Sequence, residues 1–351
     1  MPVIDVSCIS YSAYIVSASG KVLEVPYMRT LQYAESDQEL AMSATLDLNN
    51  TVIDGQYLHE HAGLGSHLKI YSNWGQAPQE VFDGIVFVND PITDTVPHVQ
   101  ITSYDPLVYL DKSKDEIYYP AGKTGAYIIR DLLQKWNVPI GTISGPNKPL
   151  AIQAFHGNTI ASAVNSVLQQ SVLAGDETYF LQFKGGVANV IPVGQNTDVY
   201  VLTDVQGGTQ IDDQWSIENL ITRVLIKGKT QPDGSVATAS IVDGLTQYGV
   251  LQEIISASSY TNMAQATDAA KQILQESGQP KLNRQLTAVD IPFLRRGDAV
   301  EVHIGTMDGV YIASGVQHDP STRTMTVQFN DIIGAAPYPK NRQGKAKVTK
   351  A

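Results

Sequence analysis

The chain has 351 residues, of which 43% are hydrophobic and 17% charged, a composition typical of a globular protein with two or three domains. Its net charge of −11 argues against nucleic acid or an anionic membrane as the main partner. The single cysteine excludes an internal disulfide and a cysteine-based zinc site, and no apolar run reaches the roughly 18 residues that span a bilayer.

The N-terminal segment carries Asp5 and no basic residue before Lys21, a pattern that does not fit a secretory signal. Cys8 stands in an alternating apolar stretch, which predicts a buried structural thiol. A nucleophilic cysteine would need a histidine base, and this stretch supplies none.

Residues 1–104 are expected to form β-structure. Ala41–Leu48 and His67–Tyr71 alternate apolar and polar side chains with the period of two that strands require. Turn formers such as Asp54-Gly55 and Asn89-Asp90-Pro91 separate the strands. This segment is predicted to be a small β-barrel or sandwich.

Residues 105–215 are expected to form an α/β unit. Thr124–Trp136 and Asn158–Leu173 place apolar residues on one helical face, and Thr124 is a suitable N-cap for the first helix. Either Asn158 or Thr159 caps the second. Strands then resume at Tyr179–Phe183 and Asn189–Ile191.

Residues 216–335 return to strands, including Arg223–Lys229 and Val250–Ile255, with one helix at about 262–278. Residues 336–351 hold five basic and no acidic side chains and are predicted to be a flexible basic tail. This tail is either a solvated terminus or an arm that docks on an acidic neighbour.

Three early segments resemble three late ones in the same order. The pairs are Gly65–Ile70 with Gly297–Val302, Gly84–Pro91 with Ala313–Pro320, and Val99–Ile101 with Val327–Phe329. The offsets of 232, 229 and 228 residues are nearly constant. This similarity indicates either a duplicated barrel or two examples of a common β-meander.

Two motifs resemble ligand sites but do not complete them. Gly122-Lys123-Thr124 opens a helix as in a phosphate-binding loop, yet Ile117 stands where that loop needs glycine, so a helix cap is the better interpretation. His59-Glu60-His61 with His67 could offer imidazoles to zinc, but no further ligand cluster accompanies them, and loop residues are favoured.

No catalytic constellation emerges from the remaining sequence. The chain lacks a Gly-x-Ser-x-Gly elbow and a His-Glu-x-x-His motif. The carboxylate pairs Asp115-Glu116 and Asp212-Asp213 lie in hydrophilic stretches where solvated charge is the default. The sequence therefore predicts no catalytic, cofactor-binding or metal-binding residues and no cofactor.

Five tyrosines gather near the predicted helices: Tyr104, Tyr109, Tyr118, Tyr119 and Tyr127. Tyrosine buries area while keeping a polar tip, which suits a protein interface. The alternative is that these side chains border the α/β core.

The chain resembles baseplate hub proteins of contractile phage tails and phage-tail-like bacteriocins, of the XkdQ/YqbQ type. The resemblance rests on hydrophobic patterns that cover nearly the whole chain to about residue 335. They are found in Ile101–Leu110, Thr124–Leu133, Arg296–Val302, Tyr311–His318 and Thr324–Val327.

This resemblance implies an α+β, mostly β fold with two tube-like β-barrel domains, 1–104 and 216–335, flanking the α/β domain 105–215. The second barrel would carry the helical insertion at 262–278. Three chains would present six barrels, so a homotrimer could join a hexameric tail tube protein to a trimeric central spike protein.

The resemblance also implies baseplate wedge proteins as partners, with the tape measure protein as a further candidate. It implies no specific nucleic acid and no membrane insertion. The expected location is a virion or tail-like particle assembled in the bacterial cytoplasm. The alternatives to this non-enzymatic role are a tail-associated cell-wall hydrolase and a glycan- or receptor-binding tail-tip protein.

Overall fold

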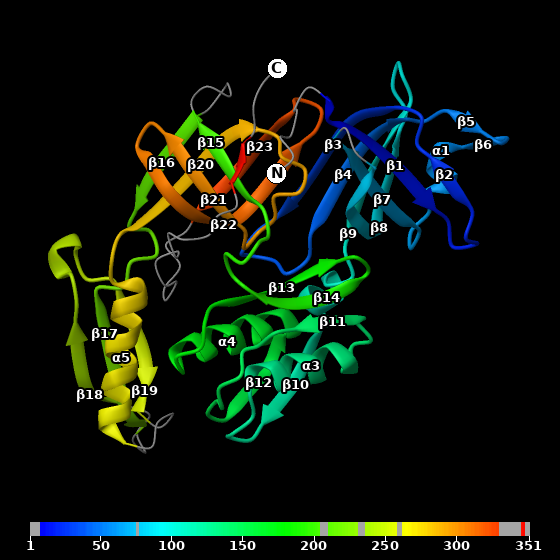
Figure 1. The fold of residues 1–351 in the computed structure, drawn as a ribbon. Coiled ribbons are helices and arrows are strands. Elements are labelled where there is room, and N and C mark those ends of the chain that lie inside the picture. The colour runs from blue at the N-terminus through cyan, green and yellow to red at the C-terminus, as the bar shows by residue number, and fades with distance from the viewer. Residues whose placement is uncertain are drawn as a thin grey trace. The chain divides into compact units, whose positions relative to one another are not determined.

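The structure is a computed structural model that describes residues 8–74, 77–203, 210–230, 236–257, 262–329 and 345–347 (Figure 1). Its contacts divide the chain into two compact units, of which the smaller is residues 212–284. Strands outnumber helices throughout, so the expected mostly β, α+β class is confirmed. Within the described residues, none of the helices combines the length and apolar character needed to cross a bilayer.

A first group of strands, here called the first half, lies in the N-terminal hundred residues. Their order in the sheet is β3-β4-β9-β8-β7-β1-β2. The strands are β1 (Ser10–Val16), β2 (Val22–Glu24), β3 (Met28–Glu35), β4 (Ser43–Asn49), β7 (His67–Asn73), β8 (Gln79–Ile92) and β9 (His98–Tyr104). The connection from β4 to β7 contains β5 (Val52–Ile53), β6 (Gln56–Tyr57) and α1 (Leu58–His61).

A second group of strands, here called the second half, comes from two stretches of the chain, residues 199–216 and residues 281–347. Its order is β16-β20-β23-β22-β21-β15, with β24 beside β15. The strands are β15 (Val199–Thr203), β16 (Gln210–Ser216), β20 (Lys281–Val289), β21 (Ala299–Ile304), β22 (Met307–Asp319), β23 (Thr324–Phe329) and β24 (Lys345–Lys347). The two halves form one continuous 14-stranded sheet because β22 pairs with β3.

The two halves repeat one strand order: β3-β4-β9-β8-β7-β1 corresponds to β16-β20-β23-β22-β21-β15. In each half one long strand exchanges partners midway. In the first half β8 pairs with β7 up to Ile85 and then with β9. In the second half β22 pairs with β21 up to Ile312 and then with β23. A bulge in the second pairing falls at Phe87 in one half and Ser314 in the other.

These pairings fix which residues correspond in the two halves. Gly65 and Gly297 both have positive φ, and each donates its backbone N–H to the long strand, at Val86 and Ala313 respectively. The offset of 232 expected for Gly65 therefore matches the structure. Along β8 and β22 the structural offset is 227, from Ile85 and Ile312, two residues less than the sequence similarity indicates. The offset from sequence and the offset from structure thus differ by two, an even number. Because side chains alternate along a strand, both alignments keep the same face buried.

Each half has its own apolar core. Leu46, Leu68 and Ile101 are fully buried in the first, and Val300, Val302 and Val327 in the second. Phe293 packs against both clusters, so the halves meet along an apolar seam. The strand order within the described residues is an open path.

The middle region, residues 105–192, has a separate α/β core. The helices α3 and α4 contact each other and bury Ile128, Leu132 and Val164. The helices are α2 (Val108–Lys112), α3 (Gly125–Lys135) and α4 (Ile160–Leu173), and the strands are β10 (Lys114–Tyr119), β11 (Ile140–Ile143), β12 (Gln153–Thr159), β13 (Tyr179–Lys184) and β14 (Val187–Pro192). The strands form two small sheets, β10-β12 and β11-β14-β13.

The smaller unit is a three-stranded sheet, β18-β17-β19, covered on one side by α5 (Figure 1). Val224 and Ile226 of the sheet pack against Ala266 and Ala270 of the helix. Its elements are β17 (Arg223–Thr230), β18 (Val236–Asp243), the 3-10 helix η3 (Thr246–Tyr248), β19 (Gln252–Ser256) and α5 (Met263–Ser277). The helix expected at about 262–278 is confirmed, and Asn262 caps it by accepting the N–H of Gln265.

The expectations for Cys8 and for the basic C-terminal tail have different outcomes. The prediction of a buried thiol is wrong, because Cys8 is exposed and precedes the alternating strand, which begins only at Ser10. In the basic tail, Lys345–Lys347 pair with β15 as the short strand β24. The rest of residues 336–351 lies outside the described residues, so flexibility there stays a prediction.

Candidate functional site

A buried charged cluster, here called the junction, lies where the first half, the second half and the middle region meet. Glu35 ends β3, and Arg295 lies in the turn between β20 and β21. The Arg295 guanidinium donates two hydrogen bonds to the Glu35 carboxylate, at 2.7 and 2.5 Å. Both side chains are almost completely buried. A paired fork of this kind fixes both distance and orientation.

Arg296 extends the junction to further backbone carbonyls. Its guanidinium donates to the carbonyl of Ser36 at 2.5 Å and to that of Leu181, in β13, at 2.7 Å. Arg295 also donates to the carbonyl of Phe183 at 3.2 Å. The two arginines therefore tie β3 and β13 to one turn of the second half.

The charges at the junction set the pKa values of its carboxyl groups. Burial would raise the pKa of Glu35, but the neighbouring Arg295 and Arg296 outweigh it and lower the pKa to about 2. Burial also disfavours the charged Arg295, yet Glu35 raises its pKa above the usual value. The pair is therefore ionised across the ordinary pH range.

Asp105 lies beside this cluster at the start of the middle region. Its carboxylate accepts the N–H of Met42 at 3.1 Å and that of Leu107 at 2.8 Å. Burial nevertheless raises its pKa to about 8. In the same way, burial raises the pKa of Asp298 to about 6, although the Arg295 N–H bonds to this carboxylate.

A second polar network lies inside the seam between the halves. His318 of β22 bonds through Nδ1 to Asp290 at 2.7 Å and is fully buried. The Tyr33 ring stacks on the His318 ring with centroids 4.3 Å apart, and the Tyr33 hydroxyl donates to the carbonyl of Pro292 at 3.2 Å. Tyr11 donates to Asp290. Residues of β1, β3 and β22 thus share one hydrogen-bonded network.

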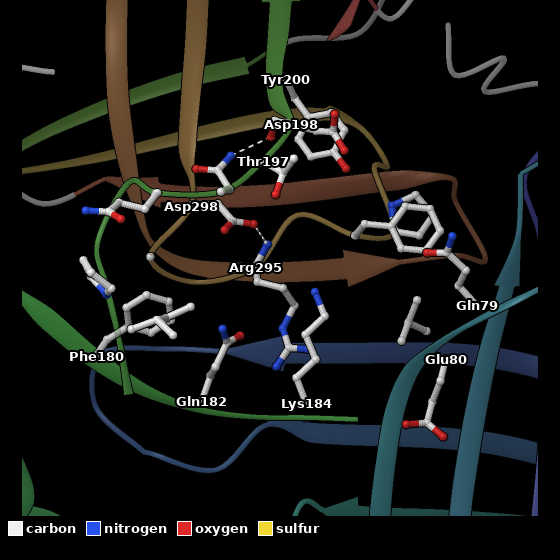
Figure 2. Close-up of a pocket in the computed structure, with 18 of the residues that line it drawn as sticks. Gln79, Glu80, Phe180, Gln182, Lys184, Thr197, Asp198, Tyr200, Arg295 and Asp298 are labelled. Atoms are coloured by element: carbon white, nitrogen blue, oxygen red, sulfur yellow. Dashed lines mark hydrogen bonds between the residues drawn. The ribbon is translucent and has the colours of Figure 1, made fainter. Parts of the chain in front are cut away.

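A cavity of about 400 Å³ opens beside the junction. Figure 2 shows Phe180, Gln182 and Lys184 of β13 along one side, with Asp298 and Arg295 above them. The lining mixes both signs of charge, and the Asp298 carboxylate is already bonded to backbone. This arrangement favours ordered polar packing between elements over acid–base chemistry.

The histidines considered as metal ligands bond to three different partners. His59 bonds to Asn50, His61 to the carbonyl of Ile53, and His67 to Asp83. No group of three or more metal-ligating side chains gathers in the part of the chain that the structure describes.

The helix caps and the first adjacent pair of acids were the other features considered in the sequence. Thr124 caps α3 by accepting the N–H of Tyr127, which confirms the helix cap, and Thr159 rather than Asn158 caps α4. Asp115 pairs with Lys135, whereas its neighbour Glu116 pairs with His156.

The remaining carboxylate pair divides likewise, because Asp213 forms a two-point contact with Arg284 while Asp212 is exposed. The two acids of each adjacent pair therefore have different surroundings.

The tyrosine group fits both of its interpretations. Tyr104 and Tyr119 pack against the core of the middle region. Tyr109, Tyr118 and Tyr127 are exposed, between 45 and 64%. The exposed members remain available for an interface.

The junction residues were not identified from the sequence. They come from segments up to 260 residues apart, and no local pattern links them. One signal was present: Arg295 and Arg296 follow a run of apolar residues, Ile291–Leu294, where two adjacent charges require buried partners.

Residues 44–330 match the model of a family described as YQBQ-like. The protein YqbQ of Bacillus subtilis (strain 168) is 25% identical over 313 residues, which cover 87% of this chain and 94% of YqbQ. The phage-like element PBSX protein XkdQ of the same organism is 26% identical over 230 residues, covering 64% of this chain and 69% of XkdQ.

Two solved structures share the fold. A tail protein from Neisseria meningitidis MC58 has a TM-score of 0.65 at 14% identity, with 94% of this chain and 100% of that chain covered. The prophage MuSo2 43 kDa tail protein from Shewanella oneidensis has a TM-score of 0.62 at 12% identity, with 91% and 98% covered. Since the family match spans most of the sequence, this chain belongs to the YQBQ-like family.

Proposed function

We propose that this chain is a non-enzymatic structural hub in the baseplate of a contractile tail. The observation that carries the proposal is the strand order shared by the two halves, with a bulge at corresponding positions. A chain with two copies of one unit presents six copies when three chains assemble. Such a homotrimer offers a pseudo-six-fold face to a hexameric tail tube and a three-fold face to a trimeric central spike.

The fold and the relatives support this role. XkdQ is named as part of a phage-like element, and the solved structures of the same fold are tail proteins. In the proposal each half is a tube-like barrel, assigned from sequence to 1–104 and 216–335, and residues 105–215 form the domain between them. The second barrel would also include β15, because this strand pairs with β21.

The proposed partners are the tail tube, central spike and baseplate wedge proteins, with the tape measure protein as a further candidate. The proposed place of action is a virion or tail-like particle assembled in the bacterial cytoplasm. The junction fits a part that must transmit load, because the buried Arg295–Glu35 ion pair is held in one geometry by two hydrogen bonds.

Light scattering on the purified chain, alone and with its spike protein, tests the proposal. We expect a mass of three times 38.1 kDa in at least one of these conditions. A monomer in both would contradict the hub, and cell-wall hydrolysis and glycan binding would then be the activities to assay.

A further inference from the structure

A buried side-chain amide lines the cavity beside the junction. In β13, Leu181 and Phe183 pack in the core of the middle region. Because side chains alternate along a strand, Phe180, Gln182 and Lys184 project to the other side, where Figure 2 shows them along the cavity. Gln182 is 7% exposed, yet no group among the described residues bonds to its amide.

A buried amide without a partner is unfavourable, because its two N–H donors and its carbonyl lose their bonds to water. Gln153 of β12 is buried to the same extent, at 6% exposed, but it donates to the carbonyl of Ala151 at 3.3 Å. Gln182 has no such bond and lines open volume instead. A molecule that enters the cavity would supply the bonds that the Gln182 amide lacks.

Two further residues of the lining carry a polar group without a partner in the part of the chain that the structure describes. Tyr200 of β15 is 7% exposed, and its hydroxyl is unbonded. The indole N–H of Trp74, which follows β7, is buried and also unbonded. With Gln182, they bring polar groups to the cavity from three separate elements. A compact ligand with polar groups around its rim matches this arrangement better than an extended peptide, whose polar groups lie in rows.

Most charged groups of the lining already lie near an opposite charge. Two ion pairs account for four of the side chains at the cavity, namely Arg295 with Glu35 and Glu80 with Lys69. Burial raises the pKa of Asp298, and the charge of Lys184 nearby partly offsets this effect. Asp198 is exposed to solvent. The lining therefore favours a neutral ligand over a strongly charged one.

Aromatic rings supply the apolar part of the lining. Phe180 lies on one side, and Trp74 and Phe293 meet edge to face with ring centroids 5.4 Å apart. The cavity volume of about 400 Å³ suits a small molecule. A sugar ring offers a C–H face to aromatic rings and hydroxyl groups that both donate and accept at its rim. An acetamido substituent adds a methyl group and an amide, and two amides can bond to each other through donor and acceptor together.

We infer that this cavity is a binding site for a neutral acetamido sugar. Gln182 bonds to the acetamido group, Tyr200 and Trp74 bond to oxygen atoms at the rim of the sugar, and Phe180 and Phe293 contact its apolar parts. The site is independent of the proposed hub function, since it needs only the cavity within one chain.

Calorimetric titration of the full chain with N-acetylglucosamine tests the ligand class. We expect a dissociation constant of about 1 mM or tighter, the affinity that a ligand of this size reaches in a fitted site. Methyl glucoside has the same ring without the acetamido group and should bind at least about tenfold more weakly. N-acetylalanine methylamide, which carries peptide amides without a sugar ring, should bind at least about tenfold more weakly as well.

A matched pair of variants tests the role of the Gln182 amide. Gln182→Met keeps the volume of the side chain and should weaken N-acetylglucosamine binding at least about tenfold. Its midpoint of urea denaturation should be unchanged or higher, because an unpaired buried polar group is removed. Gln153→Met is the control: it should lower the urea midpoint slightly, since a hydrogen bond is lost, and leave sugar binding unchanged.

The outcomes decide between a ligand site and a structural role for the amide. Sugar binding that Gln182→Met weakens without loss of stability supports the site. Absence of binding at about 10 mM N-acetylglucosamine overturns it. Unchanged binding together with a lower urea midpoint in Gln182→Met also overturns it, because the amide then serves the fold. Equal affinity for N-acetylalanine methylamide would assign the cavity to a peptide and overturn the sugar.

Discussion

The two halves of the sheet share strand order and bulge position but differ in what covers their long strands. In the second half β22 lies between neighbours and contributes His318, fully buried, to a polar network. In the first half the corresponding position of β8 is the exposed Pro91. The comparison teaches that the repeated element is the buried apolar face, whereas the edges have diverged according to their neighbours.

The sixth strand marks a second difference. β1 pairs with β7 antiparallel, whereas β15 pairs with β21 parallel. β15 follows directly from the middle region, so it enters the sheet from the opposite direction. The order of strands is therefore more robust than their direction, because burial of side chains depends on position in the sheet.

The largest expected effect comes from breaking the junction where the halves meet. Glu35→Ala leaves the Arg295 charge buried without its partner and should cost about 3–5 kcal/mol of unfolding free energy. Urea denaturation measures this loss. The control is Glu35→Leu with Arg295→Met, which removes both charges and should recover most of the stability. Equal losses in the single and double variants would contradict an ion-pair role.

Matched truncations in the two cores test whether the halves are equivalent. Ile70 and Val302 occupy corresponding positions in the two halves. Each packs in the core of its own half and is 0% solvent-exposed. Changing either to alanine should cost about 2–4 kcal/mol. Both variants should still unfold in a single transition. A second transition in only one variant would show that the halves unfold separately.

A pH titration sharpens the contrast between the charged seam and the apolar cores. The folded chain holds the Asp105 proton up to a pKa of about 8, well above the usual Asp value. Because the folded state binds this proton more tightly, its stability should fall as pH rises from about 4 to 8. Asp105→Asn should reduce the total loss of unfolding free energy between pH 4 and pH 8 by more than about 1 kcal/mol. Urea denaturation at a series of pH values measures this loss.

Two other buried carboxyl groups also affect how stability changes with pH. Asp298, with a pKa of about 6, acts in the same direction, so some slope should persist in Asp105→Asn. Glu35, with a pKa of about 2, acts oppositely and loses its stabilisation only as pH falls from about 4 toward 2. An unchanged slope from pH 4 to 8 in Asp105→Asn would contradict the buried protonated form.

The sequence predicts those parts of the fold that local pattern determines. Alternation identified β4 and β7, and helical period with a capping threonine identified α3. The prediction for Cys8 is wrong because the apolar alternation in the sequence extends beyond the first paired strand, which begins at Ser10. The junction could not be predicted, since Glu35 and Arg295 become neighbours only after two distant turns meet.

The smallest expected effect lies on the solvent face of corresponding strands. Lys69 of β7 pairs with Glu80 and Asp83, and the residue that corresponds to it in β21 is Glu301, of opposite charge. Because Lys69 is partly exposed, Lys69→Met should cost no more than about 1 kcal/mol and the difference should shrink in high salt. Glu301→Gln should change stability still less, as measured in the same urea titration. A loss from Lys69→Met comparable to that of Ile70→Ala would mean that the charged face, as well as the apolar face, defines the repeated unit.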